Sequence, residues 1–336
     1  MAPTVVEPIR ASMLLDVEGA CAHPNALKPQ EIAPALGIQI EGLDRSFAAL
    51  WRGGNVIGIG STDKEEHGSL RRKRSLILHT LAAALFSSQV RAQATSNAAP
   101  NVYLVTPHTS QTLPMLHVLL ANIISDSQAA IELLKPVRLL QYFDLAGLAE
   151  SLAEISQDLF RRSHATHEPV TADVGRCTLP KDIVLIQGLG QTVSATHRRS
   201  GLVQSNALLG NLMRNITQIS RISRDVLVLV DVALEAGVAH GPQSHQDAAR
   251  ARRMHGTIQL ESVFAGSNGE TLRLYCGHES LARTLEANLD RIVVAHDGFG
   301  RVQERGRLNR PGEQVIEVVK DRMGDLIGLW GIWKGG

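Results

Sequence analysis

The sequence predicts a mixed α/β domain with a mainly parallel central sheet and antiparallel strands near its C-terminal end. Three apolar, β-branched runs, at 56–59, 182–186 and 225–232, have the length and composition of strands buried on both faces. Helical periodicity lies between them, most clearly over 145–162, where Leu and Ile recur every three or four residues. Strands that alternate with helices are typical of βαβ units, which pair their strands in parallel.

Composition indicates a globular protein without a strong overall electrostatic field. The chain has 336 residues, of which 44% are apolar and 20% charged, enough for one large or two ordinary domains. Its formal net charge of +1 means that any contact with nucleic acid must come from a local patch.

No leader pattern or spanning run is apparent, so we expect an intracellular protein without membrane contact. Cys21, Cys177 and Cys276 match no disulfide framework or metal motif, and we expect them reduced and buried.

The sequence predicts that the chain divides into an N-terminal arm over 1–36, which contains several prolines, and a core domain over 37–336. The core opens with a short helix, a turn at Gly53-Gly54 and the first strand. A polar loop begins at Gly60, and a helix follows from Ser75. This order is the one expected of a phosphate-binding core.

The rest of the core continues the alternation. A second strand is predicted over 101–106, a helix over 113–134 and a third strand over 137–142. A helix over 206–221 precedes the strand at 225–232, and a long polar loop rich in His and Arg is expected over 233–256. Further strands are predicted over 257–262, 271–275, 287–296 and 314–319.

Two segments resemble a known family. The run GIQIEGLDRSFAALWRGGNVIGIG from Gly37 looks like the entry to the ATPase core of the RecA-type recombinases and their eukaryotic paralogues. The closing run VIEVVKDRMGDLIGLWGIW from Val315 resembles the strand, turn and final hairpin of the same core. The resemblance covers roughly Gly37 to Trp333 and implies a RecA-like P-loop NTPase core.

The nucleotide motifs of that family are degenerate here. The consensus G-x-x-x-x-G-K-[ST] is absent: in the family register Ser75 takes the hydroxyl position, Arg74 the lysine position and Lys73 that of the second glycine. A side chain in place of that glycine obstructs backbone approach to phosphate, and the Arg fork does not simply replace Lys.

Two carboxylates of the hydrolysis apparatus are also missing. Gln187 stands where the family has an Asp that orients magnesium, and no carboxylate occurs over 106–108, where the catalytic Glu is expected. We therefore expect no catalytic residue and no cofactor, with ATP kept as an alternative ligand. The degenerate nucleotide loop comprises Gly60, Lys73, Arg74, Ser75 and Gln187.

Basic clusters fall at places that resemble the family's two DNA-binding loops. The first holds Arg198 and Arg199, and the second holds Arg250, Arg252 and Arg253. Arginines in flexible loops can contact phosphate, although a solvated charged face is the simpler interpretation of each cluster alone. Aromatic residues make up only 4% of the chain, so a base-stacking platform is not indicated.

Other chemistries lack support. His240, His245 and His255 match no compact ligand spacing, and we expect no metal site. No G-x-S-x-G elbow of a serine hydrolase is present. The phrase Gly188-Leu189-Gly190 lacks the third glycine of a dinucleotide fingerprint and is interpreted as a turn.

The resemblance implies a non-catalytic recombinase paralogue, an assembly and DNA-docking subunit of homologous recombination and DNA repair in the nucleus. Its partner would be a related recombinase-like subunit in a hetero-oligomer. One alternative is a divergent DNA-dependent ATPase that uses Arg74 and Ser75. Another is a RecA-like scaffold subunit of an Elongator-type tRNA-modifying complex.

Overall fold

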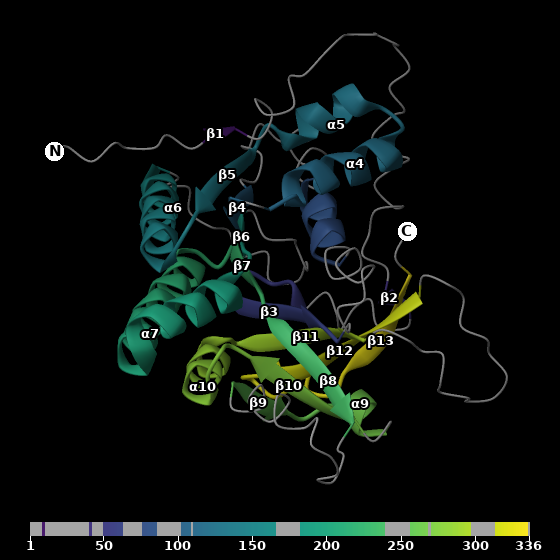
Figure 1. The fold of residues 1–336 in the computed structure, drawn as a ribbon. Coiled ribbons are helices and arrows are strands. Elements are labelled where there is room, and N and C mark those ends of the chain that lie inside the picture. Colours follow the sequence, from purple (N-terminus) through teal and green to yellow (C-terminus); the bar gives the residue numbers. More distant parts are fainter. Residues whose placement is uncertain are drawn as a thin grey trace, which may run out of the picture.

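The computed structural model describes residues 9–10, 40–41, 50–62, 76–85, 102–108, 110–165, 182–238, 256–267, 270–296 and 313–334. They form a ten-stranded sheet, a three-stranded sheet and the helices around them (Figure 1). The strands of the large sheet are β1 (Ile9–Arg10), β2 (Ile40–Glu41), β3 (Val56–Ser61), β4 (Val102–Pro107), β5 (Val137–Tyr142), β6 (Asp182–Ile186), β7 (Val226–Asp231), β11 (Arg291–His296), β12 (Glu313–Asp321) and β13 (Trp330–Lys334). The small sheet contains β8 (Ala233–Val238), β9 (Thr257–Leu260) and β10 (Glu270–Tyr275).

The labelled helices are α4 (Thr112–Ile124), α5 (Ser127–Leu134), α6 (Leu145–Ala165), α7 (Leu189–Ile222), α9 (Val263–Ser267) and α10 (Glu279–Asn288). A further helix covers residues 76–85.

The large sheet has the order β1-β5-β4-β6-β7-β3-β11-β12-β13-β2. The six strands from β5 to β11 are parallel, and β12 and β13 continue the sheet in antiparallel fashion. This arrangement confirms the predicted mixed α/β fold with a mainly parallel sheet and C-terminal antiparallel strands.

Helices cover both faces of the sheet (Figure 1). Helix 76–85, α4 and α5 bury their apolar sides in one core cluster, together with Ile59, Leu104 and Leu185 of the strands. Helices α6, α7 and α10 pack into the cluster on the other face, which also includes apolar residues of the small sheet. Because both faces are covered, the central strands are apolar at nearly every position, as the sequence predicted.

Several predicted boundaries differ from the structure. The helix expected over 113–134 is two helices, because Ser125 has a left-handed backbone and Asp126 caps α5. The polar loop expected from residue 233 begins with β8, which pairs with β10, and residues 239–255 lie outside the described part. The helix expected from residue 206 is the second part of α7, which follows a kink at Gly201, and a first part from Leu189 precedes that kink.

In the predicted strand 287–296, only Arg291–His296 is extended, since α10 continues to Asn288. Cys276 is buried, as expected, and burial raises the pKa of its thiol to about 12. Cys21 and Cys177 lie outside the described residues, and the division at residue 36 stays a prediction.

Polar contacts hold α6 against the sheet. The Asp158 carboxylate accepts hydrogen bonds from Tyr103 of β4 and from Arg138 Nη1 of β5, the latter at 2.7 Å. Arg162 donates to Asp182 of β6 at 2.8 Å and to the Tyr103 hydroxyl at 2.7 Å. The helix is thereby joined to three adjacent strands, which positions its first turn at the opposite end.

A second buried cluster joins the two sheets. Glu317 of β12 is fully buried and accepts hydrogen bonds from Ser262 Oγ at 2.6 Å and from the Val263 amide at 2.7 Å. Its Oε2 atom also lies 2.6 Å from His296 Nε2 of β11. Burial alone would raise the pKa of Glu317, but the bonds from His296, Ser262 and Val263 hold it below the ordinary value of 4.5.

Replacing Glu317 with glutamine should reduce the acid sensitivity of the fold. Because the folded-state pKa lies below the unfolded one, ionised Glu317 stabilises the protein above about pH 4.5. That stabilisation is lost as the pH falls through the folded-state value. We expect Glu317→Gln to be less stable than wild type at pH 7, with the difference narrowing below pH 4.5. Urea unfolding across pH measures this, and a constant difference would contradict the assignment.

Candidate functional site

The carboxyl ends of the central parallel strands form a polar edge. Ser61, Thr106, Gln187 and Asp231 lie at or just beyond the ends of β3, β4, β6 and β7. The residue two positions before each of them belongs to the core cluster that packs against helix 76–85 and α4. Because side chains alternate along a strand, all four residues lie on the face of the sheet that these helices cover. We call these four residues the edge row.

Gln187 is held by two hydroxyl groups. It is only 7% exposed, and its side-chain oxygen accepts from Thr112 Oγ1 at 2.5 Å and from Ser110 Oγ at 3.2 Å. The two hydroxyls lie 2.9 Å apart. The oxygen that faces α4 is therefore satisfied within the protein, and the side chain carries no charge to orient a metal ion.

Tyr142 fixes the backbone beside Gln187. Its hydroxyl donates to the Gln187 carbonyl, and its pKa is raised to about 12 by burial, which outweighs a hydrogen bond with Thr192. The phenol therefore stays protonated and remains a donor at neutral pH.

Sequence reasoning missed three members of the edge row as site residues: Ser61, Thr106 and Asp231. Asp231 is the last residue of β7, which pairs with β6. Its position at the end of the apolar run DVLVLVD is the sequence signal that could have identified it. Thr106 is 1% exposed, and its hydroxyl has no hydrogen-bond partner within the described residues. The edge row therefore combines one carboxylate with neutral groups.

Gly60 has a packing role that differs from the predicted one. It lies inside β3, which continues to Ser61, so the loop does not open at this glycine. A Cβ atom at Gly60 would lie 2.4 Å from Leu234 Cδ1 of β8. The absence of a side chain lets β8 approach β3. The other loop residues, Lys73, Arg74 and Ser75, lie outside the described part of the chain.

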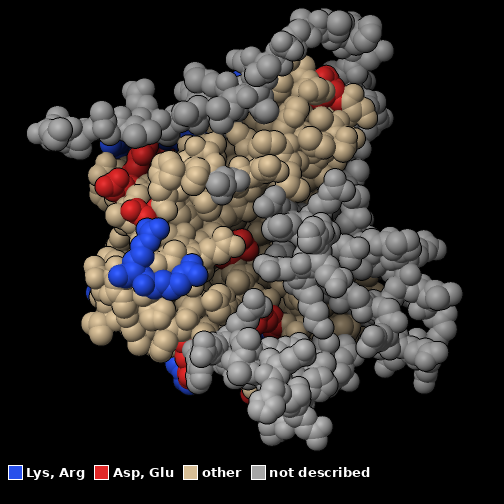
Figure 2. All heavy atoms as spheres, in the orientation of Figure 1, with Lys and Arg blue, Asp and Glu red and all other residues tan. Residues whose placement is uncertain are grey.

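Arg198 and Arg199 lie in a helix, whereas a loop was expected. Both are exposed in the last turn of α7 before a kink at Gly201, where φ is 77° and ψ is 175°. Neither makes an ion pair within the described residues. Figure 2 shows basic side chains gathered on the surface where α6 meets α7. Arg250, Arg252 and Arg253 of the second cluster lie outside the described residues.

Gly188 begins α7 in a left-handed conformation with φ of 74°. A Cβ there would also lie 2.6 Å from Pro107 Cγ. Gly188 is therefore the start of a helix packed on the end of β4. Leu189 and Gly190 already belong to α7, so the turn predicted for all three residues was wrong for these two.

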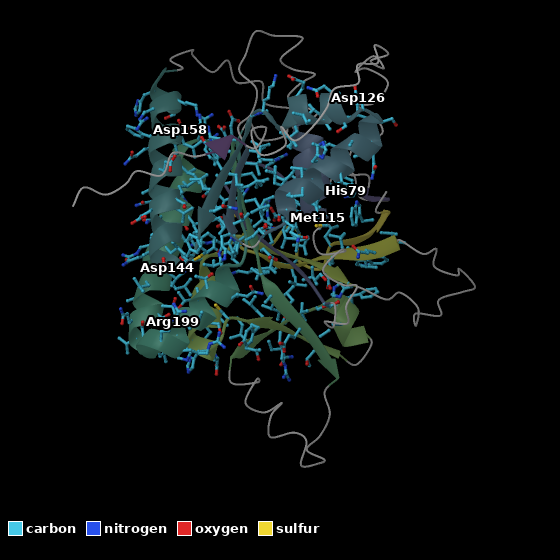
Figure 3. The ribbon with its side chains drawn as sticks, turned by 45° about the horizontal axis from the view of Figure 1, so that its top comes forward. His79, Met115, Asp126, Asp144, Asp158 and Arg199 are labelled. Carbon is cyan, nitrogen blue, oxygen red and sulfur yellow. The ribbon has the colours of Figure 1, made fainter. Side chains whose placement is uncertain are left out.

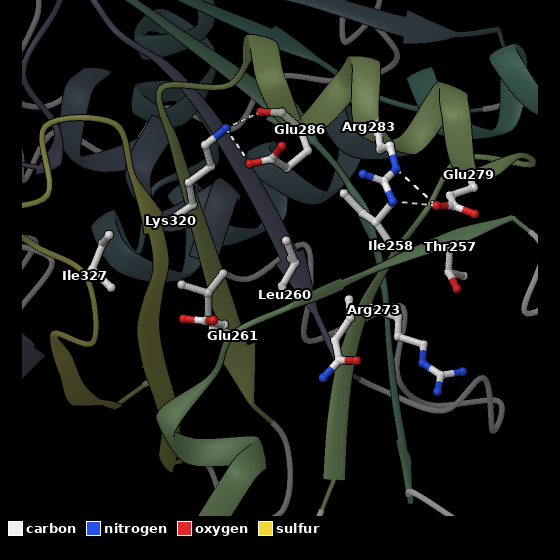
Figure 4. A pocket seen from close by; sticks show the side chains of 12 residues that line it. Thr257, Ile258, Leu260, Glu261, Arg273, Glu279, Arg283, Glu286, Lys320 and Ile327 are labelled. Atoms are coloured by element: carbon white, nitrogen blue, oxygen red, sulfur yellow. Dashed lines mark hydrogen bonds and ion pairs between the residues drawn. The ribbon is translucent and has the colours of Figure 1, made fainter.

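A groove lies elsewhere, between β9, α10 and β12, and measures about 740 Å³ (Figure 4). Its opposite charges pair with each other: Lys320 lies 2.6 Å from Glu286, and Arg283 lies 2.6 Å from Glu279. The groove therefore offers no concentrated positive charge to a polyanion.

Neither a metal cluster nor a membrane-spanning helix is found in the described ranges. No group of three or more His, Cys, Asp or Glu side chains suited to a metal ion occurs there. None of the helices found there is long and apolar enough to cross a membrane. His240, His245 and His255 fall outside these ranges.

Solved structures share the overall fold of this chain. The chain is similar to the crystal structure of the RadB recombinase, with 11% sequence identity and a TM-score of 0.47. The match covers 86% of this chain and 93% of that chain. No family model matches the sequence, and no curated protein matches it.

The position of Arg198 and Arg199 should depend on Gly201. Its φ and ψ values are rarely adopted by residues with a Cβ, so Gly201→Ala should cost roughly 1–3 kcal/mol of stability or straighten α7. Gly210→Ala is the matched control: the added Cβ would have free space in the same helix and should stabilise it by about 0.5–1 kcal/mol. Thermal unfolding measures both changes. Equal effects would contradict the role of Gly201.

Proposed function

We propose that this chain is a non-catalytic, RecA-like subunit that docks DNA in homologous recombination and repair. It would act in the nucleus, in a hetero-oligomer with a related recombinase-like subunit. One observation carries the proposal: the edge row is neutral at the ends of β4 and β6, while unpaired arginines are exposed on α7 at the same edge.

The contacts of Gln187 argue against hydrolysis. Phosphoryl transfer needs magnesium and an oriented water, both of which depend on carboxylates at these strand ends. The Gln187 oxygen is already bound by Ser110 and Thr112, and its amide cannot compensate the charge of a metal ion. Thr106 likewise provides only a hydroxyl at the end of β4.

The arginines support a docking role. Arg198 and Arg199 are adjacent and exposed, so they can meet neighbouring phosphates without desolvating a buried charge. Because the net charge of the chain is only +1, electrostatic attraction to DNA would depend on this patch and on other local clusters.

Replacing both arginines tests the docking function. Arg198→Ala/Arg199→Ala should weaken binding to a DNA oligonucleotide about tenfold at low salt and reduce the salt slope by about 2, because two phosphate contacts are lost. Fluorescence anisotropy over a salt series measures both quantities.

The matched control is Arg161→Ala/Arg221→Ala, which removes two exposed arginines near the opposite ends of α6 and α7. It should retain wild-type affinity. Equal losses in the two double variants would indicate a general charge effect, and no loss in either would overturn the docking role.

A divergent DNA-dependent ATPase is the second candidate, and Asp231 is the observation that favours it, since it places a carboxylate beside β6. Phosphate release should be absent with and without single-stranded DNA if the leading proposal holds. Release that is abolished by Ser75→Ala would instead establish the ATPase.

A further inference from the structure

We propose that His108 and Phe143 form a platform on which an unpaired DNA base stacks. This aromatic platform rests on the proposed DNA-docking function and adds a ligand class to it: single-stranded DNA, recognised through the face of a base. The low aromatic content did not indicate such a surface, but two rings that are 35 positions apart in the sequence meet in the fold.

The register of two parallel strands brings the rings together. Pro107 of β4 pairs with Tyr142 of β5, so the next residues, His108 and Phe143, leave the sheet side by side. Their ring centroids are 4.5 Å apart, and the ring planes are inclined by 30°. Both residues are exposed, and Phe143 is 78% accessible to solvent. The two rings contact each other, and the rest of the pair presents aromatic surface to solvent.

The backbone on either side of Phe143 is well anchored. Tyr142 is buried and bonds to the Gln187 carbonyl, while Asp144 accepts a hydrogen bond from the Gly147 amide at 2.9 Å in the first turn of α6. A ring held between two ordered residues loses little conformational entropy when a base stacks on it.

The platform lies at the same end of the molecule as the arginines. Phe143 is two residues before α6, and α6 packs beside α7. Figure 3 shows Asp144 and Arg199 at this common end, and Figure 2 shows the basic surface where the two helices meet. If Arg198 and Arg199 bind phosphates of a DNA strand, a base of the same strand would lie near the rings of His108 and Phe143.

The chemistry favours an unpaired base over a duplex. Bases inside a duplex are covered on both faces by their neighbours, whereas an unpaired base can stack on an aromatic ring whatever its sequence. The Asp144 carboxylate beside Phe143 disfavours a phosphate at that point, so the base rather than the backbone would occupy it.

The experiment compares three labelled probes of about 20 nucleotides: oligothymidine, an abasic strand with the same phosphates, and a duplex. Phe143→Ala in the full chain should weaken binding of oligothymidine about tenfold and binding of the abasic strand less than about twofold, because only the base stacks. Phe143→Trp should restore the affinity.

Phe160→Ala is the matched control. Phe160 is 57% exposed and contacts His164 with ring centroids 4.1 Å apart, but it lies near the other end of α6. It should bind all three probes as wild type does. Circular dichroism of each variant verifies that the fold is retained.

The outcomes separate the two proposals. If Arg198→Ala/Arg199→Ala weakens binding while Phe143→Ala changes nothing, or weakens all three probes equally, the platform is overturned and docking stands. If wild type binds none of the probes, both proposals fail.

Discussion

Parallel pairing of the central strands is the constraint on which the site depends. Parallel strands all end at one edge of the sheet, so β3, β4, β6 and β7 deliver their last side chains to a common surface. The alternation of side chains then decides which of those residues share a face. Ser61, Thr106, Gln187 and Asp231 meet for this reason, although more than 100 residues separate the first from the last.

At this edge of the sheet the strand ends are largely neutral, and the positive charge lies on α7. The edge row is largely neutral, and its best-ordered contacts are hydrogen bonds between uncharged groups around Gln187. Such bonds contribute about 1 kcal/mol each and favour a rigid arrangement over chemistry. Positive charge lies outside, on the exposed Arg198 and Arg199 of α7. Under the proposed function, these exposed arginines would meet the phosphates of DNA.

Glycines at this edge serve packing as much as loop formation. Gly60 admits Leu234 against β3, and Gly188 starts α7 where a Cβ would clash with Pro107. Gly201 has an open environment and is required by its backbone angles instead. From sequence alone a glycine beside a polar loop suggests phosphate binding, because the neighbouring chain that approaches it is not apparent.

The sequence by itself determined the central strands, the long helix α6, the uncharged side chain of Gln187 and the absence of a carboxylate at residues 106–108. These properties depend on local periodicity and on residue identity, which are properties of the chain alone. It also located Arg198 and Arg199, but the prediction of a loop was wrong because both lie in the part of α7 that precedes the kink at Gly201.

Only the tertiary structure decided which separated residues meet. The contact of His108 with Phe143 follows from the register of β4 and β5, and the bonds of Gln187 follow from the packing of α4 beside β6. The role of Asp231 likewise depends on its place next to β6. Such contacts join residues far apart in the chain, and no local pattern specifies their pairing, because the register is set by the whole sheet and the core on both of its faces.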